Sequence, residues 1–492
     1  MAITSEQLTP WQRRLVPGLT ELLFVLLFLS QLDARLFSEV TGLHLWAGLE
    51  VLRHGPGLLP DTLSFTRQGA LWLNPEWLGD VVLALAWRHA AYLGVAVLCA
   101  LVFAGTFTWL YRILVDETDQ PAVSLMVTLL AAAVAYLHLA ARPSTLVLPF
   151  LLAAWELTRK PRPEWAAFAL PALAALWANV HPSVLVVPLL AGYAALTHSR
   201  GPRGWIIAVL CLGALSATPT GAAWLVEIIP SSADLAFLRG IDEWKPPRLD
   251  ELRFLGVWVY AAVALVARRG GAPLGRAERL LGLSVLAVSL LVVRMAPLAG
   301  VVWAPRLARD LTAHAARARG MPGAVLAVLQ ETLAPFERVF RPGLWPAVFG
   351  VGAILAAPCL GAFLPGVERG FSTADFPVRA LTEAARLDLG PRVLNADGWG
   401  DYISWVGRGR WRVFMDARVG LYSGSVLADY LGIAGLRPGW EGALAQYRPD
   451  WLLWRNGARL AREVVDSGRW RVAYRDSLAV ILTPVPPPGT AR

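Results

Sequence analysis

Charged residues are scarce in this sequence. Asp, Glu, Lys and Arg make up only 16% of the 492 residues, whereas hydrophobic residues make up 56%. Soluble globular proteins usually carry about 25% charged residues, and the mean hydropathy here is +0.50. Apolar runs recur between residues 17 and 364, and many approach the roughly 20 residues that a membrane-spanning helix needs. This composition excludes an ordinary soluble enzyme and predicts an α-helical polytopic membrane protein.

Cysteine and the familiar catalytic motifs are also lacking. The three cysteines, Cys99, Cys211 and Cys359, each lie within an apolar run, which excludes a disulfide framework and a zinc site of spaced ligands. The sequence has no Gly-rich phosphate loop and no nucleophile elbow. No motif therefore assigns a cofactor or a metal ligand, although clustered carboxylates could bind a divalent cation.

The basic residues behind the net charge of +9 lie mainly in short turns between apolar runs. The positive-inside rule places them there in a membrane protein, so nucleic acid is excluded as a partner and the lipid bilayer is expected. Arg13 and Arg14 precede the first apolar run, which predicts a cytoplasmic N-terminus at the inner (plasma) membrane. No cleavable signal peptide is evident.

About eleven transmembrane helices are predicted, which leaves the C-terminus outside. The stretch 76–90 is expected as an interfacial or re-entrant helix, because it is short and carries Asp80, Arg88 and His89. The predicted spans, each near the length that a bilayer requires, are 17–33, 91–115, 121–141, 144–158, 164–180, 183–198, 204–221, 253–268, 277–294, 296–311 and 345–364.

Two domains are predicted. Residues 1–370 form the transmembrane domain, with an external first loop at 34–90, and residues 371–492 form an extracytoplasmic domain. In that tail, short apolar runs alternate with helical stretches, which indicates a small α/β domain with a largely parallel sheet. The expected strands are 392–395, 411–415, 451–454, 470–474 and 478–482.

The segment 41–78 is long, mixed in polarity and placed directly after the first apolar run. Leu45, Leu49 and Leu52 recur at helical spacing, which predicts an amphipathic helix lying in the interface. Gly55-Pro56-Gly57 should end that helix. We expect a turn and a second short helix to come next. Loops of this length between spans are usually functional or disordered, and the periodic apolar residues argue against disorder.

Unusual polar residues are expected at the external ends of several helices. Polar groups at membrane depth are costly and are therefore functional candidates. Carboxylates beside arginines and a histidine could bind a phosphate-linked donor and activate an acceptor hydroxyl. The candidates are Glu39, Asp61, Glu76, Arg142, Asn179, His181, Glu243, Trp244 and Arg294.

Simpler interpretations compete with this one. Asp61 follows a proline and could equally start a turn or cap a helix, and Arg142, Asn179 and Arg294 could be helix-end or snorkelling residues. A lone His181 is more often a satisfied interfacial histidine than a ligand. The pair Asp416 and Arg418 follows a predicted strand end, where α/β proteins bind ligands, but a structural ion pair is the favoured interpretation.

The layout resembles the GT-C superfamily of polytopic glycosyltransferases, which includes protein mannosyltransferases and lipid A aminoarabinose transferases. It is also similar to a narrower group of bacterial membrane proteins whose first loop carries short His, Gly, Asp and Glu-Trp-Leu motifs. The matching residues are His44, Gly48, His54, Gly55, Asp61, Ser64, Glu76, Trp77, Leu78, Trp177, Asn179, His181, Glu243, Trp244, Asp416 and Arg418.

The resemblance implies transfer of a sugar from a polyprenyl-phosphate donor to an acceptor on the external face, where the acceptor is a glycan, a lipid or a protein. A loop carboxylate, Asp61 or Glu39, would act as the catalytic base, and Arg142 and Arg294 would hold the donor phosphate. The remaining candidates, among them His44, would line the binding site. The acid that the resemblance places a few residues before His44 falls at Val40, so the adjacent Glu39 is the substitute and Asp33 the poorer one.

Two other classes of function stay open. A lipid or polysaccharide transporter or flippase would need a cavity near the midplane and usually inverted repeats, and no convincing repeat is visible. A non-catalytic envelope scaffold is compatible with the missing acid at Val40. An outward cavity with a lipid-sized opening favours the transferase, a midplane cavity favours the transporter, and a filled cavity favours the scaffold.

Overall fold

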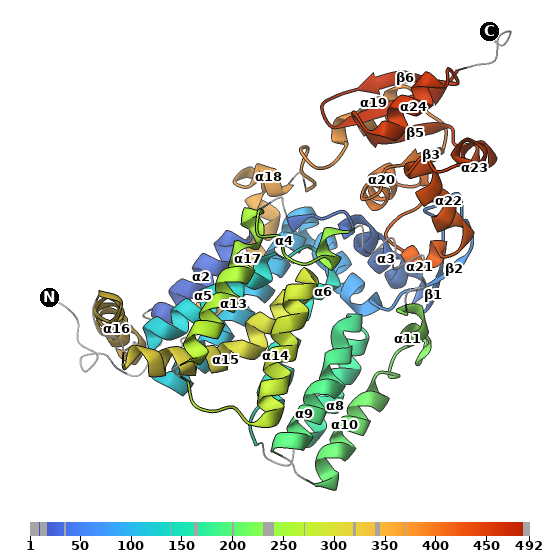
Figure 1. Ribbon diagram of the computed structural model, residues 1–492. Helices are drawn as coiled ribbons and strands as arrows, with labels where there is room; N and C mark the ends of the chain where they lie inside the picture. Colours follow the sequence, from blue (N-terminus) through green and yellow to red (C-terminus); the bar gives the residue numbers. More distant parts are fainter. Residues whose placement is uncertain are drawn as a thin grey trace.

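The computed structural model describes residues 9, 17–33, 36–137, 139–161, 166–198, 201–229, 241–269, 271–317, 321–339, 345–368 and 370–485. A large helical part precedes a small sheet domain at the C-terminal end of the chain (Figure 1). This mostly helical architecture with a C-terminal sheet confirms the coarse outline of the predicted fold class.

Helices follow almost every predicted apolar run. In the first half of the chain they are α2 (Leu19–Ser30), α3 (Thr41–His54), α4 (Trp77–Thr118), α5 (Pro121–Tyr136), α6 (Pro143–Leu146), α7 (Leu148–Thr158), α8 (Ala166–Ala178), η3 (Pro182–Leu185), α9 (Val186–Thr197), α10 (Pro202–Ala214) and α11 (Ala223–Glu227). The later ones are η4 (Asp242–Trp244), η5 (Leu252–Phe254), α13 (Leu255–Arg268), α14 (Arg276–Leu291), η6 (Val293–Met295), α15 (Ala296–Ala315), α16 (Met321–Val339), α17 (Trp345–Ala356), η7 (Ala357–Ala362) and α18 (Pro365–Glu368).

Most of these helices are shorter than the predicted spans. Among the described residues, only α4 and the stretch Trp345–Ala362 are long and apolar enough to cross a membrane by length and composition. The predicted runs 121–141 and 204–221 end as helices at Tyr136 and Ala214. The expectation that each run reaches span length is therefore wrong, and the number of spans stays a prediction.

Helix α4 is broken at the predicted boundary between residues 90 and 91. Ala90 and Ala91 have non-helical backbone angles, and Ala91 has a φ of 46°. Gly94 lies one turn further on, where an added Cβ would clash with the carbonyl oxygen of Ala86. The glycine therefore lets the two halves of α4 meet closely. The predicted boundary between the helix 76–90 and the span 91–115 therefore coincides with this kink, and helical structure resumes after it.

The first loop contains the predicted helix but departs from the prediction after it. Helix α3 ends at Gly55, whose φ of 86° favours glycine. The second predicted helix is present as the first half of α4, but the simple turn before it is wrong: strands β1 (Leu58–Pro60) and β2 (Leu71–Leu73) form an antiparallel hairpin there. Trp72 of this hairpin packs on Trp46 of α3, so tertiary packing stabilises strands that are too short to predict from periodicity.

The C-terminal domain has a five-stranded sheet in the order β4-β3-β5-β7-β6. Strands β4, β3 and β5 are parallel, whereas β7 and β6 join them antiparallel. The prediction of a largely parallel sheet therefore holds only for β4, β3 and β5, because the hairpin of β6 and β7 joins them antiparallel. The strands are β3 (Arg392–Asn395), β4 (Arg412–Val413), β5 (Trp451–Arg455), β6 (Trp470–Arg475) and β7 (Ala479–Pro484). The helices are α19 (Val378–Arg386), α20 (Gly400–Gly407), α21 (Val419–Tyr422), α22 (Ser425–Ala434), α23 (Trp440–Tyr447) and α24 (Arg459–Asp466).

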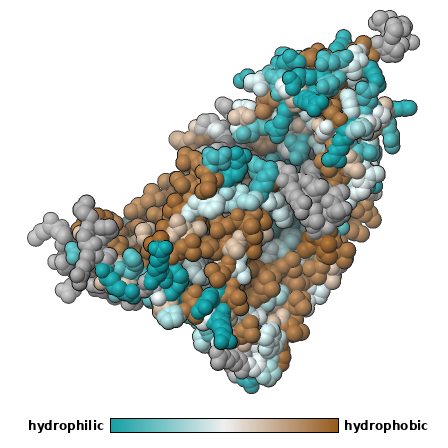
Figure 2. Space-filling model, viewed as in Figure 1, coloured by the Kyte–Doolittle hydropathy of each residue, from teal (hydrophilic) through white to brown (hydrophobic). Residues whose placement is uncertain are grey.

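The first loop docks directly onto this sheet. Ser64 forms an isolated parallel bridge with Val413 of the edge strand β4. The backbone amide of Val413 donates to the Leu63 carbonyl, and that of Phe65 donates to the Val413 carbonyl. Figure 2 shows a surface that is broadly hydrophobic over the helical part and mostly hydrophilic over the C-terminal domain. The loop thus joins a helical part with an apolar exterior to a domain with a polar exterior.

Candidate active site

A cavity of about 720 Å³ lies where the first loop, several helix ends and the C-terminal domain meet. The loop contributes residues around Glu39 and Glu76, and the helical part contributes the segment 241–244 and side chains at helix ends. The C-terminal domain contributes residues that follow its strands β3, β4 and β5. The carboxyl ends of parallel strands are a common place for ligand sites.

The cavity brings together most of the residues predicted from the sequence. Asp61 and Asn179 do not line it. The predicted residues that do line it are Glu39, His44, Glu76, Arg142, His181, Glu243, Trp244 and Arg294.

Two arginines and one glutamate form a cluster on the helical side of the cavity. Arg142 caps α6 just before Pro143, and Arg294 lies in η6 at the start of α15. Arg142 Nη2 is 2.8 Å from Glu243 Oε1, and Arg294 Nη1 is 2.5 Å from Glu243 Oε2. Arg294 also lies over the Trp244 ring, 5.6 Å from its centroid. The cluster carries one more positive than negative charge, which favours an anionic group such as a phosphate in front of it.

A second group combines histidines with carboxylates at the start of α4. His44 Nδ1 is 2.7 Å from Asp80 Oδ1, and Asn74 Nδ2 donates to Asp80 Oδ2 at 2.7 Å. Glu76 lies 3.7 Å from His44 Nδ1 and 3.2 Å from His181 Nε2. Sequence analysis missed Asp80 as a site residue, although its position in an apolar stretch was the signal available.

These neighbours shift the protonation of the group. Burial raises the pKa of Glu76 to about 6 from its ordinary value of 4.5. For His44, burial lowers the pKa, but the charge and hydrogen bond of Asp80 outweigh that effect and raise it. Burial, with the nearby Arg294 and Arg142, holds the pKa of His181 well below its usual value. His44 is therefore the histidine that favours the charged form, and His181 favours the neutral form.

The same group could also hold a divalent cation. One ligand atom each from His44, Glu76 and Asp80 lies within 4.8 Å of the others. One imidazole nitrogen and two carboxylate oxygens suit several divalent metals. In the structure these atoms also satisfy one another through the hydrogen bond between His44 and Asp80, so the arrangement does not depend on an ion.

Glu39 lies at the boundary between the loop and the C-terminal domain. Partial burial raises its pKa, as do Asp397 and Glu243, whereas Arg142 and Arg455 oppose the shift. A carboxylate with a raised pKa is a stronger base, and a base works best when its pKa approaches the operating pH. Glu39 is therefore suited to accept a proton, and it is more exposed than Glu76, another loop carboxylate with a raised pKa.

The C-terminal domain contributes charged residues that sequence analysis did not assign to the site. Asp397 follows β3, Asp401 lies in α20, and Arg455 ends β5. Burial raises the pKa of Asp397, and burial together with Asp416 raises that of Asp401 well above its usual value. The strand-end argument applied to Asp416 would have found Asp397 and Arg455 as well, since β3 is the parallel neighbour of β4 and β5 is the parallel neighbour of β3.

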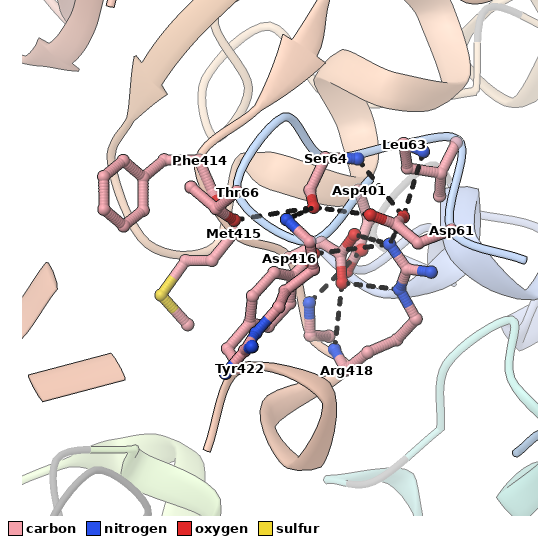
Figure 3. Close-up of polar contacts among 12 residues, drawn as sticks. Asp61, Leu63, Ser64, Thr66, Asp401, Phe414, Met415, Asp416, Arg418 and Tyr422 are labelled. Carbon is pink, nitrogen blue, oxygen red and sulfur yellow. Dashed lines mark hydrogen bonds and ion pairs between the residues drawn. The ribbon is translucent and has the colours of Figure 1, made fainter. Parts of the chain in front are cut away.

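Asp61 belongs to a cluster of polar contacts with Ser64, Asp416 and Arg418 (Figure 3), and it does not itself line the cavity. It accepts hydrogen bonds from the backbone amides of Leu63 and Ser64 at 3.0 and 3.2 Å and from the Ser64 hydroxyl at 2.6 Å. Arg418 Nη2 lies 2.6 Å from Asp61 and 2.5 Å from Asp416. Asp61 is 1% exposed. The expectation that Asp61 faces the acceptor as a base is therefore wrong, because it does not line the cavity. Asp416 and Arg418 form the ion pair, and both also line the cavity.

Arg418 is held on its other side by tryptophans of the first loop. Its guanidinium carbon lies 5.5 Å from the Trp46 ring centroid and 5.3 Å from that of Trp72. These cation–π contacts add to the ion pairs. One arginine of the C-terminal domain thus fixes both the helix and the hairpin of the loop, and this contact keeps Glu39 and Glu76 opposite Asp397 and Asp401.

Asn179 has the helix-end role that was considered as an alternative. Its Oδ1 accepts from Trp77 Nε1 at 2.8 Å, and its Nδ2 donates to the carbonyls of Ala175 and Ala217 at 2.8 Å. The side chain therefore ties the start of α4 to the end of α8. It positions Glu76 and His181 without reaching the cavity.

Comparison with known proteins gives a limited result. No family model and no curated protein sequence matches the chain. Solved structures that match include the crystal structure of ArnT from Cupriavidus metallidurans bound to undecaprenyl phosphate. That similarity has a TM-score of 0.46 and 12% identity over 95% of this chain and 97% of the other. A similarity of this kind transfers no activity, so the residues of the site have to indicate the function.

Proposed function

We propose that the protein is a polytopic membrane glycosyltransferase that moves a sugar from a polyprenyl-phosphate donor to an acceptor hydroxyl. The observation that carries the proposal is a cavity that combines an arginine pair with carboxylates of raised pKa. An anion-binding cluster opposite a base is the minimum that such a transfer needs.

In this proposal Glu39 is the base. It takes the proton of the acceptor hydroxyl while the acceptor oxygen forms a bond to the anomeric carbon of the sugar. The bond between that carbon and the phosphate oxygen breaks, and the oxygen leaves with the electron pair. Arg142 and Arg294 stabilise the negative charge that grows on the departing polyprenyl phosphate. A single displacement of this kind inverts the anomeric centre.

The other predicted residues have supporting roles in the proposal. Trp244 and Glu243 orient the two arginines. His44, Glu76 and His181 line the side of the cavity nearest the start of α4, where they fix the sugar or hold a divalent cation. Asp397, Asp401 and Arg455 face them from the C-terminal domain, which would place the acceptor between the two parts of the chain.

A lipid donor fits the exterior of the helical part. Large apolar side chains remain exposed on α2 and α10, among them Leu26 at 56%, Val209 at 66% and Leu212 at 60%. Extended exposed apolar surface marks a membrane or protein contact, and the cavity opens among helix ends rather than at mid-helix. We propose that these helices lie in the inner membrane with the C-terminal domain outside, so that the donor phosphate reaches Arg142 and Arg294 from the lipid.

The transporter and the scaffold explain less. A transporter needs a central site reached from both sides, whereas the candidate residues gather at one end of the helices. A scaffold gives no reason for an open cavity of about 720 Å³ lined by charged side chains, because buried charge without a ligand is costly.

The deciding experiment is a transfer assay on the purified full chain in lipid nanodiscs, with a panel of polyprenyl-phosphate sugars and candidate acceptors. We expect release of polyprenyl phosphate and a new glycosidic bond of inverted configuration for at least one pair. Glu39→Gln in the same preparation is the comparison variant and should slow that release by about 10²- to 10⁴-fold. Failure of every donor to turn over in a folded preparation would refute the transferase and leave the scaffold as the better explanation.

A further inference from the structure

A second hollow lies at the opposite end of the helices from the candidate active site. It is a groove of about 1080 Å³ between α9, α10 and the first turns of α14, which lie beside one another at the lower end of Figure 1. Its walls carry large apolar side chains that remain highly exposed. These are Leu189 at 70%, Leu196 at 57%, Val209 at 66%, Leu212 at 60% and Leu280 at 68%.

The groove runs into a polar pocket of about 160 Å³ between α7, α14 and α15. Tyr193, His198, Glu278 and Leu281 line both hollows, so the two adjoin each other. Among the described residues, their walls together carry five basic side chains and one acidic one, Glu278, and two of the basic side chains, Arg159 and Lys160, are paired with Glu117 and Glu156 behind the wall. The basic residues are Arg159, Lys160, Arg276, Arg306 and Arg309.

The basic side chains differ in how firmly they are held. Arg306 is fixed by Asp310 at 3.1 Å and Glu278 at 3.4 Å. Arg309 lies 4.0 Å from Glu278, and half of its side chain is exposed. Arg276 is the first residue of α14, where the helix dipole disfavours a cation. Helix stability therefore does not explain Arg276, which lines the groove next to the pocket, whereas an anion bound where the two hollows adjoin would.

We propose that this groove and pocket form a binding site for an anionic phospholipid of the cytoplasmic leaflet. The acyl chains would lie along the leucines of α9 and α10, and the phosphate would lie among Arg276, Arg306 and Arg309. Basic pockets between membrane helices on the cytoplasmic side bind anionic head groups in this manner. The site goes beyond the proposed transferase activity and rests only on the proposed placement of the helices in the membrane.

This site is separate from the donor cavity. Helix α14 has 16 residues between Arg276 and Leu291, and a helix of that length spans about 24 Å. Arg276 lies at one end of it and Arg294 follows the other end. An apolar groove joined to a basic pocket fits a lipid better than a soluble phosphate, because a soluble anion would leave the groove exposed to its surroundings.

The test is native mass spectrometry of the detergent-solubilised full chain titrated with phosphatidylglycerol or phosphatidylcholine. We expect phosphatidylglycerol to bind at least about fivefold more tightly, because each juxtamembrane cation contributes a factor of that order. Arg276→Gln and Arg309→Gln should each remove about that factor. Arg269→Gln is the matched control, since Arg269 lies at the same end of the helices but lines neither hollow.

A steric variant tests the groove without changing charge. Gly192 of α9 lines the groove, and a Cβ added there meets nothing within 4 Å, so Gly192→Leu should fill the space without disturbing the fold. Gly213→Leu on α10 is the control, because Gly213 has equal room and lies outside the groove. We expect only Gly192→Leu to weaken phosphatidylglycerol binding.

Three results would overturn the lipid site. They are equal affinity for the two lipids, unchanged binding in both arginine variants, and competition by inorganic phosphate as effective as by the lipid. Loss of transfer activity in Glu39→Gln has no bearing on these measurements, so failure of this site and failure of the proposed function are distinguishable.

Discussion

Two arginine–carboxylate clusters of similar composition lie on either side of the first loop. In one, both carboxylates, Asp61 and Asp416, are buried and paired to the same guanidinium of Arg418, and only Asp416 and Arg418 reach the cavity wall. In the other, Arg142 and Arg294 share Glu243 at the wall of the open cavity. The carboxylates of the first cluster are therefore committed to contacts within the protein, whereas the second cluster retains a net positive charge at the cavity.

The difference shows that residue type alone does not tell whether a charged side chain has a structural or a catalytic role. Asp61 lies in a polar external loop and has the sequence context of a catalytic acid, yet it is the more deeply buried of the two loop candidates. Glu39 occupies an ordinary place beside Val40 but faces the cavity. A buried, paired charge stabilises an arrangement, while a charge at a cavity wall can act on a ligand.

The largest expected effect tests a residue that lines the cavity, Glu39. Glu39→Gln keeps the shape and hydrogen bonding of the side chain but cannot accept a proton. Transfer should fall about 10²- to 10⁴-fold, the usual contribution of a general base, with an unchanged thermal midpoint. Initial rates with the donor identified in the panel assay measure this. Glu50→Gln, which changes a glutamate paired with Arg53 on α3 of the same loop, should leave the rate intact. Full activity in Glu39→Gln would place the base elsewhere.

The next effect tests the buried cluster of Asp61, Asp416 and Arg418. Asp61→Asn leaves Arg418 buried with one carboxylate, and breaking a buried ion pair commonly costs about 3–5 kcal/mol. The thermal midpoint should fall markedly, while the turnover of the fraction that remains folded stays close to that of the parent. Calorimetry combined with activity per folded molecule checks both statements. An unchanged midpoint with lost activity would reverse the assignments of Asp61 and Glu39.

A smaller effect is expected at the donor-binding arginines. Arg294→Gln removes one charged donor, and hydrogen bonds to charged groups contribute about 1.5–3 kcal/mol. The KM for the polyprenyl-phosphate sugar should therefore rise roughly tenfold to a hundredfold. Arg248→Gln, an exposed arginine paired with Asp250 outside the cavity, is the control. Equal KM values for the two variants would exclude Arg294 as a phosphate ligand.

The smallest effect concerns pH. The pKa of Glu76 is raised from 4.5 to about 6, so the folded protein binds this proton more tightly than the unfolded chain. Stability from Glu76 is therefore full below pH 4.5 and declines by about 2 kcal/mol as pH rises through 6. Glu76→Gln does not titrate, so its thermal midpoint relative to the parent should rise across that window. Parallel pH profiles for the two proteins would contradict the shift.

Much of the fold could be predicted because it rests on local pattern. Strand β3 occupies the predicted residues 392–395, and the apolar run at 451–454 became β5. The break in α4 at Ala91 coincides with the predicted boundary between a short helix that carries polar residues, 76–90, and a longer apolar helix, 91–115. Helix ends were less predictable, since the apolar runs continue beyond the last helical turn and composition does not mark where the hydrogen bonding stops.

The site residues of the helical part could be predicted from the sequence, whereas those of the first loop and the C-terminal domain could be predicted only poorly. Arg142 and Arg294 stand out because charge inside apolar sequence is costly. The burial of Asp61 could not be inferred, because its partner Arg418 is 357 residues away and pairing over such distances leaves no local pattern. The hairpin of β1 and β2 was missed for the same reason: Trp72 owes its position to Trp46 and Arg418.

The bridge between Ser64 and Val413 has a consequence for biogenesis. The ribosome delivers the loop early and strand β4 near the end, and contacts that are distant in sequence close slowly. Until synthesis reaches Val413, the loop hairpin lacks its partner, and the cavity has only one wall. A chain truncated before residue 371 would therefore enter the membrane with its arginines in place and no completed pocket. If the proposed transferase activity holds, this order keeps the cavity residues from acting on the lipid-linked donor before the protein is whole.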